Sequence, residues 1–426
     1  MKVPHLHQLF LDSSGASTDT RKIKPGSIFF ALKGENFNAN EFASEALGKG
    51  AAYAVVDEDL HQENDKFIRV ENVLKALQEL AAYHRNYLRL PILALTGSNG
   101  KTTTKELFNA VLSKKYRTVA TVGNLNNHIG VPLTLLSMTK ETEFGIVEMG
   151  ANHQKEIGFL CNIASPDYGF ITNFGKAHLE GFGSVEGVIK GKKELYDHLK
   201  AQQKLLFLNL DDPLQAQESK YGRTYCFGSS READLQLSYY REETYAGLEV
   251  EGNKFCGQLT GSYNGTNMAA AYAVGKYFDV PVDHIIAALK TYSPQNNRSQ
   301  IILKDNRRII LDAYNANPSS MAAALENLQS MEGAPKIAIL GDMFELGTSA
   351  SWEHEHLLEQ YQKSNIDKIY AIGSNFHQTQ ISSQKIKKFE SFEEFRSWFQ
   401  PSEFNAGIIL IKGSRGMALE RLMELI

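Results

Sequence analysis

Short apolar runs alternate along this chain with longer segments in which apolar residues recur at helical spacing. A short apolar run predicts a buried strand, whereas an i, i+3, i+4 spacing predicts an amphipathic helix. The clearest helix is expected at residues 73–85, because Leu74, Leu77, Leu80 and Ala81 fall on one face. Strands that alternate with such helices indicate an α/β protein with mostly parallel sheets.

The first 88 residues predict a small α/β domain. Strands are expected at residues 27–32 and 52–56, a helix closed by glycine at 42–50, and the helix at 73–85 as the last element. Polar loops at 17–21 and 33–40 accompany these elements. They either bind a small ligand or are ordinary solvent-exposed loops, and spacing alone does not decide between the two.

Residues 89–296 predict a larger central domain, and residues 297–426 a third domain of the doubly wound, Rossmann-like type. In the central domain, strands are expected at 91–95, 144–147 and 168–172, a helix at 185–199 and a β-rich segment at 207–259. Residues 293–297, SPQNN, read as a linker. In the third domain, strands are expected at 308–311, 336–340, 368–372 and 407–411, with helices between them, among them 319–330, and a last helix at 417–425.

Composition narrows the function classes. The chain has 45 basic and 49 acidic residues, so no basic field indicates nucleic acid or a membrane surface. No apolar run is long enough to span a bilayer, and the first residues lack a signal-peptide pattern. The 3 cysteines are far apart, which gives no disulfide framework and fits a reducing compartment. We expect a cytoplasmic protein with no nucleic-acid partner and no membrane insertion.

Residues 93–105, LALTGSNGKTTTK, carry the strongest chemical signal. A strand breaks into a glycine turn and a helix begins directly after it, which is the arrangement of a phosphate-binding P-loop. The usual motif has glycine where this chain has Leu95, so the form is a variant, and the alternative is an ordinary turn before a helix. ATP binding is the interpretation we adopt. The residues expected to contact it here are Gly97, Asn99, Gly100, Lys101, Thr102 and Thr103.

Two polar residues follow strands that should lie beside the P-loop strand. Glu148 ends the strand at 144–147, where a nucleotide-binding sheet carries a Mg²⁺ ligand, although a helix-capping glutamate is the alternative. His178 follows the strand at 168–172 and is either a ligand at the same sheet edge or a structural histidine.

Two helices carry polar residues whose roles the residues alone leave open. The helix at 185–199 carries Lys190, Lys192 and Lys193, a charge pattern that is typical of a solvated helix face. Asn264 and Asn267 lie at the start of a helix rich in small residues. They either cap that helix or donate amide hydrogen bonds to a base.

Several motifs of this chain resemble those of the Mur ligases, the ATP-dependent amide-bond-forming enzymes of peptidoglycan precursor synthesis. They are TGSNGKTTTKEL (96–107), GNLNNHIGVPLTLL (123–136), EMGANHQKEI (148–157), ITNFGKAHLEGFGSVEGV (171–188), YNGTNMAAA (263–271), DAYNANPSSM (312–321), LGDMFELG (340–347) and KGSRGM (412–417). The resemblance covers essentially the whole chain. EMGANH and YNANPSSM point to the branch that adds D-Ala-D-Ala to UDP-MurNAc-tripeptide.

The resemblance implies a catalytic set made of Lys101, Glu148, His178 and Lys192. Thr102, Glu148 and His178 match positions that hold Mg²⁺ in the family. Lys192 matches a lysine that CO₂ carbamylates, and its carbamate helps to hold a second Mg²⁺. The family usually has alanine at Gly191 and commonly glycine at Lys193.

The resemblance also implies binding residues in all three domains. Asn264 and Asn267 match adenine-side amides, and Arg298 and Asp312 match residues that reach the nucleotide. Ser17, Asp19 and Arg21, with Phe29, Phe30 and the loop 34–42, resemble the part that receives the UDP end, with Asn40 in place of the usual histidine. Asn126 and Asn127 resemble the amides that face the muramoyl portion, and Tyr314, Asn315 and Asn317 the dipeptide side.

The implied enzyme uses ATP and two Mg²⁺ ions, joins UDP-MurNAc-tripeptide to D-Ala-D-Ala through an acyl phosphate, and is expected to be a monomer. A sister Mur-type ligase or a folylpolyglutamate synthase is the nearest enzymatic alternative. A P-loop module that binds ATP without forming bonds is the alternative from a different class.

Overall fold

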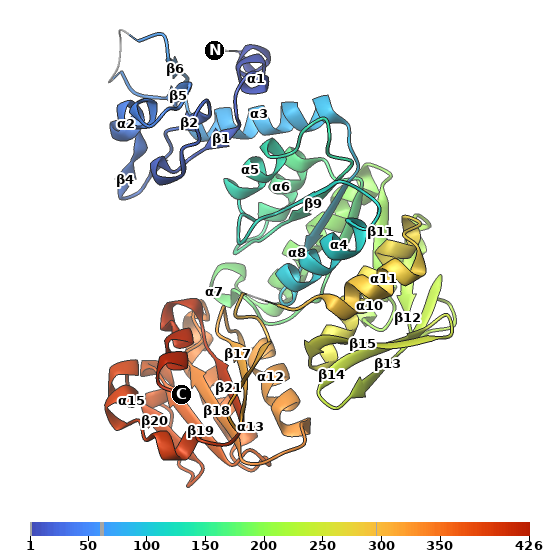
Figure 1. Cartoon of the computed structure of the whole chain (residues 1–426), viewed down its shortest axis with the longest axis vertical. Helices are drawn as coiled ribbons and strands as arrows, with labels where there is room; N and C mark the ends of the chain where they lie inside the picture. Colours follow the sequence, from blue (N-terminus) through green and yellow to red (C-terminus); the bar gives the residue numbers. More distant parts are fainter. Residues whose placement is uncertain (1, 60–63, 295) are drawn as a thin grey trace.

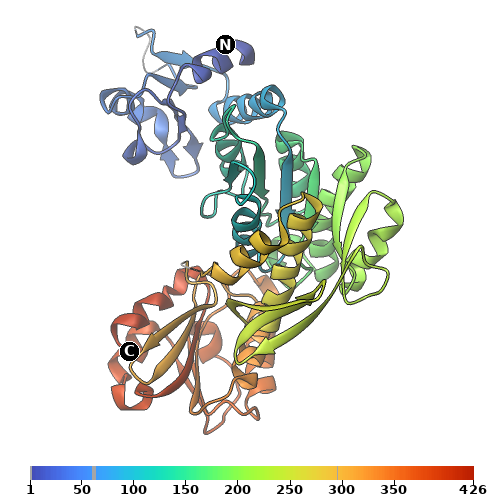
Figure 2. The ribbon, with the colours of Figure 1, turned by 45° about the vertical axis from the view of Figure 1, so that its right-hand side comes forward.

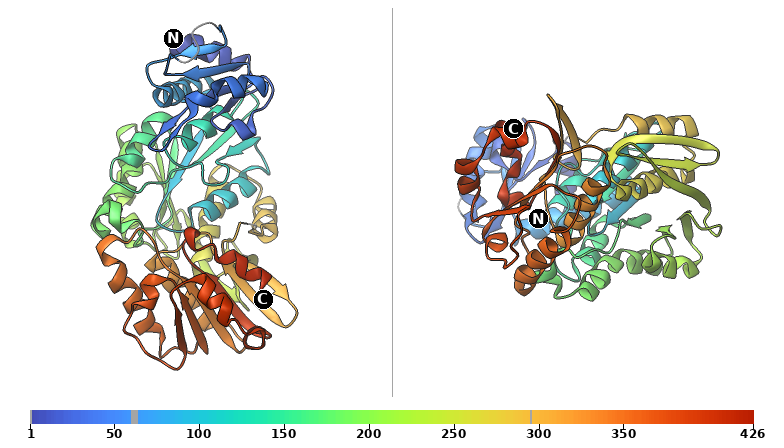
Figure 3. Two further views of the ribbon diagram at one scale, coloured as in Figure 1. Left: turned by 90° about the vertical axis from the view of Figure 1, so that its left-hand side faces the viewer. Right: turned by 90° about the horizontal axis from the view of Figure 1, so that it is seen from below.

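The computed structural model describes residues 2–59, 64–294 and 296–426. Three α/β domains follow one another along the chain, and each is built on its own sheet. The N-terminal and C-terminal domains lie at opposite ends of the central domain in Figures 1 and 2 and in the left view of Figure 3. The α/β fold with mostly parallel sheets predicted from the sequence is confirmed.

The N-terminal domain has a four-stranded parallel sheet in the order β1-β2-β5-β6. Its strands are β1 (Ala16–Ser17), β2 (Ile28–Phe30), β5 (Tyr53–Val56) and β6 (Phe67–Arg69). A two-stranded ribbon, β3 (Lys33–Gly34) and β4 (Phe37–Asn38), precedes helix α2 (Ala43–Gly48). Helices α1 (Val3–Leu11) and α3 (Val73–Leu88) pack on each other, and α3 also packs on the central domain, so it joins the two.

The central domain contains a nine-stranded sheet in the order β15-β14-β13-β12-β11-β10-β7-β9-β8. Its parallel strands are β7 (Ile92–Thr96), β8 (Thr118–Ala120), β9 (Phe144–Glu148), β10 (Tyr168–Ile171), β11 (Leu205–Asn209), β12 (Thr224–Gly228) and β13 (Leu235–Glu242). Strands β14 (Tyr245–Val250) and β15 (Asn253–Thr260) extend it antiparallel. The β-rich segment expected at 207–259 forms strands β11 to β15 of this sheet.

Helices cover both faces of the central sheet because the apolar residues of its strands alternate between two cores. Leu93 and Leu95 of β7 pack with α4 (Lys101–Leu112), α10 (Ser262–Tyr277) and α11 (Val282–Thr291). Ile92 and Ala94 point to the opposite core. That core contains α5 (Gly130–Leu136), α6 (Glu156–Ala164) and α8 (Val185–Ala201).

The C-terminal domain has a six-stranded sheet in the order β16-β17-β21-β18-β19-β20, with only β16 antiparallel. The strands are β16 (Gln300–Lys304), β17 (Arg307–Asp312), β18 (Lys336–Gly341), β19 (Lys368–Ile372), β20 (Ile386–Phe389) and β21 (Gly407–Lys412). The helices are α12 (Pro318–Ser330), α13 (Ala350–Tyr361), α14 (Ser374–His377) and α15 (Phe392–Trp398).

Three expectations about the last third of the chain need correction or remain open. The edge strands β16 and β20 were not expected, because both are short and polar on one side. The helix expected at 417–425 is wrong: this segment forms 3₁₀ turns at Arg415–Met417 and Leu419–Glu424, since Ala418 between them is left-handed at φ 48°. Gln295, in the expected linker, lies outside the described residues.

In the described part of the chain, no helix is both long enough and apolar enough to span a membrane.

Candidate active site

The P-loop connects β7 to α4 and requires glycine at two positions. Gly97 and Gly100 have φ angles of 144° and 76°, in the region that glycine favours. A Cβ atom on Gly97 would lie 2.0 Å from the Oγ1 atom of Thr172, which follows the neighbouring strand β10. Leu95, where the usual motif has glycine, is a fully buried residue inside β7. The glycine turn therefore begins later here and closes against β10.

Lys101 is the first residue of α4, and its amine turns back toward the loop. Its Nζ atom donates to the carbonyl oxygens of Gly97 at 2.7 Å and Ser98 at 3.2 Å. Burial lowers the pKa of Lys101 to about 8, while nearby Glu148 acts in the opposite direction. This ammonium is held by two carbonyls in an enclosed space, where an anion would bind more strongly than at an open surface.

Glu148 is brought to the P-loop by the sheet register, in which Leu95 pairs with it across β7 and β9. Its Oε1 atom accepts hydrogen bonds from Thr102 Oγ1 at 3.3 Å and Asn126 Nδ2 at 2.8 Å. Its Oε2 atom is buried without a partner. A helix cap would bind backbone N–H groups, whereas the side chain of Glu148 bonds to two side chains. The unsatisfied oxygen fits a cation ligand.

His178 reaches the same site from the loop after β10. It has a left-handed backbone with φ 52° and precedes helix α7 (Leu179–Phe182). Its Nδ1 atom lies 2.6 Å from Oε2 of Glu345 in the C-terminal domain. The hydrogen bond to His178 lowers the pKa of Glu345. His178 therefore lines the cavity and also contacts the opposite domain.

The solvated-face interpretation of the helix at 185–199 is wrong for Lys192. Its side chain is fully buried, and Nζ donates to Ala151 O at 3.2 Å and lies 5.0 Å from the centre of the Phe182 ring. Burial, and secondarily the charge of Lys101, lower its pKa well below the usual value. Lys192 lies behind Ala151 and is not itself among the residues that line the cavity.

The structure gives a physical reason for both unusual neighbours of Lys192. A Cβ atom on Gly191 would lie 2.5 Å from the Phe182 ring, so alanine does not fit here while that ring keeps its position. Lys193 turns the other way and forms an ion pair of 2.8 Å with Glu218.

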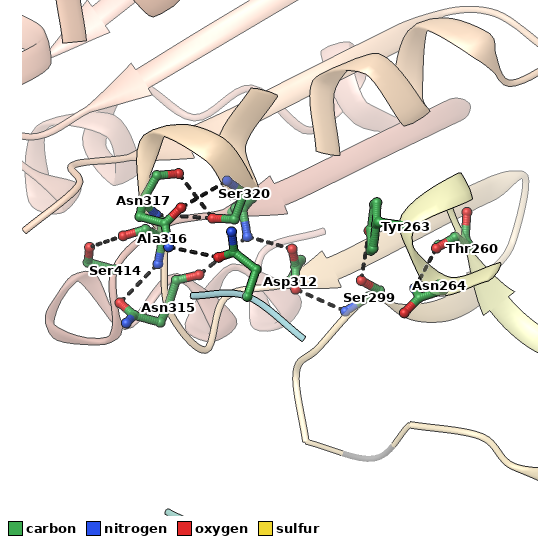
Figure 4. A network of polar contacts seen from close by, with 12 residues as sticks. Thr260, Tyr263, Asn264, Ser299, Asp312, Asn315, Ala316, Asn317, Ser320 and Ser414 are labelled. Atoms are coloured by element: carbon green, nitrogen blue, oxygen red, sulfur yellow. Dashed lines mark hydrogen bonds and ion pairs between the residues drawn. The ribbon is translucent and has the colours of Figure 1, made fainter. Parts of the chain in front are cut away.

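Residues of the C-terminal domain form the opposite wall of the cavity. Figure 4 shows polar contacts among several of them, including Asp312, Asn315 and Asn317. Asp312, at the end of β17, accepts from the backbone N–H of Ser299 at 3.0 Å and from Lys412 Nζ at 2.5 Å. The guanidinium of Arg298 stacks 3.6 Å from the centre of the Tyr314 ring, and its Nε atom is buried without a partner. This wall offers a cation, an aromatic face and a carboxylate to a ligand.

Asn264 and Asn267, on α10, form hydrogen bonds within the protein. Not all of their amide donors are therefore available to a ligand. Asn264 Nδ2 donates to Thr260 O at 2.7 Å, and Asn267 Nδ2 donates to Asn264 Oδ1 at 2.9 Å (Figure 4 shows the first bond). Asn267 Oδ1 accepts from Thr104 Oγ1 at 3.2 Å. Both residues are buried and line the cavity, so they support its wall.

Asn317 links the two domains directly. It caps α12 through a capping box with Ser320, and its Nδ2 atom donates to Asn99 Oδ1 of the P-loop at 2.8 Å. Asn315 accepts from the backbone N–H of Ala316, and it lines the cavity with Tyr314. The domains also meet through Lys176, whose Nζ atom lies 2.8 Å from Oε1 of Glu353.

A single cavity of about 780 Å³ collects most of the predicted residues. Those that line it are Asn99, Gly100, Lys101, Thr102, Thr103, Asn126, Asn127, Glu148, His178, Asn264, Asn267, Arg298, Asp312, Tyr314, Asn315 and Asn317. Gly97 and Lys192 do not line the cavity, but each is hydrogen-bonded to a residue that does. The Gly97 carbonyl accepts from Lys101, and Lys192 donates to the Ala151 carbonyl. Ser17, Asp19 and Arg21 belong to the N-terminal domain and are not part of the cavity.

A separate pocket of about 510 Å³ lies in the N-terminal domain. Its lining includes Asp19, Arg21, Phe37 and Phe42, and the rings of Phe37 and Phe42 stack with centres 5.3 Å apart. The hydrogen bonds from Arg21 lower the pKa of Asp19 to about 2. Ser17 does not line the pocket, although its Oγ atom donates to Asp19 O at 3.1 Å.

Asn40, which replaces the usual histidine of this loop, is fully buried. Its amide donates to Asn38 Oδ1 and to Asp57 Oδ1, and its Oδ1 atom accepts from the Asp57 backbone. Asn40 does not line the pocket. It joins its own loop to Asp57, the residue that follows strand β5.

Sequence reasoning assigned no role to Asn173 and Lys412, although both stand in the quoted motifs. Asn173 Oδ1 accepts from the Asn99 backbone N–H at 3.0 Å, so it shapes the P-loop. Lys412 is buried beside Asp312. Asn173 follows a parallel strand and Lys412 ends one, at the sheet edge where ligands bind. That position could have indicated from the sequence that both residues belong to the site.

A P-loop cavity closed by a second α/β domain defines a nucleotide-dependent enzyme of the multidomain α/β class. Models of the Mur ligase family catalytic domain, the Mur ligase middle domain and the Mur ligase glutamate ligase domain match residues 13–85, 95–275 and 297–415. The UDP-N-acetylmuramoyl-tripeptide–D-alanyl-D-alanine ligase of Bacillus subtilis is 36% identical over 96% of this chain and 92% of its own length. The chain therefore belongs to the Mur ligase family, and its relatives assign it to the MurF branch.

Two solved structures agree over nearly the full length. MurF from Acinetobacter baumannii has a TM-score of 0.88 and 31% identity, covering 99% of this chain and 98% of that protein. MurF ligase from Thermotoga maritima in complex with ADP has a TM-score of 0.83 and 28% identity, covering 98% of this chain and 97% of that protein. The resemblance inferred from the motifs is confirmed.

Proposed function

We propose that this chain joins the terminal carboxylate of UDP-MurNAc-tripeptide to the amine of D-Ala-D-Ala, with ATP as the energy source, to give the UDP-MurNAc-pentapeptide of peptidoglycan synthesis. The observation that carries the proposal is the P-loop cavity, whose far wall belongs to another domain, in a chain that matches a MurF enzyme over 96% of its length. Such a cavity can hold ATP against one wall and the incoming amine against the other.

ATP is assigned to the P-loop side of the cavity. Backbone N–H groups of the loop and the start of α4 bind the phosphates, and Lys101 reaches the β- and γ-phosphates after exchanging its present carbonyl partners. Arg298, stacked on Tyr314, and Asp312 lie where the nucleoside end would extend. Asn264 and Asn267 support this wall, and the dipeptide is assigned to Asn315 and Asn317.

Magnesium is assigned to Thr102, Glu148 and His178. These residues fit the ion because Glu148 Oε2 is buried without a partner and hard oxygen ligands suit Mg²⁺. When bound, two such ions would neutralise charge on the transferring phosphoryl group.

Lys192 is assigned as a carbamate that contributes to the second ion. Its neutral amine would form a C–N bond to CO₂ and release one proton, and the carbamate oxygens would then extend past Ala151 toward the cavity. Burial and the nearby charge of Lys101 both favour an uncharged amine, and the positive charge of Lys101 would also attract the negative carbamate.

The reaction has two balanced steps. A carboxylate oxygen of the tripeptide bonds to the γ-phosphorus while the bond to the bridging oxygen of ADP breaks. The amine of D-Ala-D-Ala then attacks the acyl carbon, loses a proton, and phosphate leaves. The docked C-terminal domain, held by Lys176–Glu353 and Asn317–Asn99, would keep water from the acyl phosphate.

The UDP end of the substrate is assigned to the N-terminal pocket, through Asp19, Arg21 and the Phe37–Phe42 stack, with Ser17 behind them. Asn127, which lines the P-loop cavity, is assigned to the muramoyl portion. We assign the domains to residues 1–88, 89–296 and 297–426. Because one chain supplies both pockets, we propose that a monomer is sufficient for the reaction. We further propose that the protein is cytoplasmic.

The test is ADP release from ATP by the purified chain. Release should require both a UDP-muramoyl tripeptide and D-Ala-D-Ala, and the product should gain the mass of the dipeptide less water. Release with an amino acid and a shorter precursor, or with glutamate and a folate, would assign a sister activity. ATP binding without release for any acceptor would leave a nucleotide-binding module and overturn the proposal.

A further inference from the structure

Asn126 contacts the carboxylate that we assign to magnesium. Its Nδ2 atom donates to Glu148 Oε1 at 2.8 Å, a charge-assisted hydrogen bond between a loop and the end of β9. The resemblance to Mur ligases had suggested that this amide faces the muramoyl portion of the substrate. The structure instead directs one of its two donors to the protein itself.

The two carboxylate oxygens of Glu148 have different environments. Oε1 accepts from both Asn126 and Thr102, whereas Oε2 is buried and has no partner. A carboxylate held by one oxygen cannot rotate freely about its last side-chain bond. The other oxygen is therefore presented in a fixed direction into the cavity, where a cation would gain from a ligand that is already oriented.

The backbone around this contact is fixed from both sides. The Asn126 carbonyl accepts from the Gly150 backbone N–H at 2.8 Å, and a Cβ atom on Gly150 would lie 2.9 Å from the Asn126 side chain. At the start of the loop, Thr121 Oγ1 accepts from the Glu148 backbone N–H at 2.9 Å. The Thr121 carbonyl in turn accepts from Nζ of Lys105, which is 1% exposed, at 2.5 Å.

We propose that Asn126 is a positioning residue for the metal site: it sets the orientation of Glu148 and thereby the affinity for a divalent cation. The proposal rests on the assignment of magnesium to Glu148 under the proposed function. A purely structural role is a weaker account, because the packing of this loop is already fixed by Gly150 and Thr121. A purely substrate-binding role would leave the contact with Glu148 without consequence.

The test measures binding of Mn²⁺ by electron paramagnetic resonance, with the full-length chain, ADP and no UDP-substrate. Asn126→Ala and Asn126→Leu remove the amide donor, and Asn162→Ala removes an exposed amide of α6 as the matched control. Glu148→Gln reports whether the cation depends on this carboxylate. Circular dichroism and the unfolding midpoint establish that each variant is folded, and steady-state assays give KM for the UDP-substrate at saturating Mg²⁺.

We expect both Asn126 variants to bind Mn²⁺ roughly 10-fold more weakly than wild type. Asn162→Ala should be unchanged. Weaker Mn²⁺ binding without the UDP-substrate supports the proposal whatever KM does. Unchanged Mn²⁺ binding in both variants overturns it, and a raised KM would then make Asn126 a substrate ligand only. If Glu148→Gln binds Mn²⁺ as wild type does, the magnesium assignment fails and the positioning role fails with it.

Discussion

The two pockets of this chain are built in different ways. The cavity at the P-loop draws its walls from residues between Ser98 and Lys412, so it exists only because two domains dock. The N-terminal pocket is lined by residues between Thr18 and Phe42, all within one small domain. The first pocket is formed by residues that are far apart in the sequence, and the second by residues that are close together in it.

Their side chains differ accordingly. The P-loop cavity contains half-buried polar groups that bond to one another across domains, such as Asn317 with Asn99, and one buried oxygen of Glu148 that has no partner. The N-terminal pocket offers an exposed ring, Phe37, and the ion pair of exposed Arg21 with half-buried Asp19. Under the proposed assignment, catalysis and recognition of the UDP end take place in two separate pockets, and the variants below test that separation.

The largest effect is expected from Lys101→Ala. Loss of the ammonium that faces the phosphates should lower kcat by roughly 1,000-fold, because a preorganised charge at the transferring group is removed. Circular dichroism should be unchanged. Lys190→Ala, which removes an exposed lysine of α8, is the matched control. Normal turnover in Lys101→Ala would contradict the P-loop assignment, and binding of the UDP-substrate should survive if the pockets are separable.

Lys192→Ala should lower kcat by roughly 100-fold, because the carbamate that we propose as a support for the second metal ion is lost. A short-chain carboxylic acid should restore part of the activity by supplying a carboxylate in the space left by the side chain. Lys193→Ala, one position away and paired with Glu218, should keep its activity. Wild-type turnover of Lys192→Ala without additives would exclude the carbamate.

The fold class and much of the P-loop cavity could be predicted from the sequence because their signals are local. A glycine turn between a strand and a helix defines the phosphate site, and a polar residue at the end of a neighbouring parallel strand falls on the same edge. Glu148 illustrates this, since the register that pairs it with Leu95 follows from the parallel sheet.

Burial of charged helix residues and cross-domain contacts could not be predicted in the same way. The periodicity of residues 185–199 reads as a solvated face, yet Lys192 is fully buried because it points under Phe182 and Ala151. Asn126 bonds to Glu148 through a loop whose path no local pattern specifies. The 3₁₀ turns near the C-terminus depend on the left-handed backbone at Ala418, a residue type that favours regular helix.

A smaller effect, confined to the other pocket, is expected from Phe37→Ala. Removing the exposed ring that stacks on Phe42 should raise KM for the UDP-substrate roughly 10-fold, since stacking of a base on an aromatic ring contributes about 1–3 kcal/mol. Phe37→Tyr keeps the ring and should behave as wild type. Mn²⁺·ADP binding should not change, and a change there would show that the pockets are coupled.

The smallest effect is expected at the joint between the N-terminal and central domains. His7 Nε2 lies 3.0 Å from His84 Nδ1, and His84 Nε2 lies 2.9 Å from Met138 O in the central domain. The aromatic neighbours of His7 include Tyr83 and Tyr87, and Lys140 lies over the Tyr87 ring. Burial lowers the pKa of both histidines below 6.5, and for His7 the charge of His84 adds to this.

Because the folded chain binds these protons less readily than the unfolded chain, the pair stabilises the fold above pH 6.5. That contribution is lost as the pH falls through the lowered pKa values. The urea midpoint of the wild type should therefore drop between pH 7.5 and pH 5.5, and His84→Gln, which keeps a donor for Met138, should drop less. If the urea midpoint of His84→Gln falls as steeply as that of the wild type, this histidine pair does not cause the loss of stability at low pH.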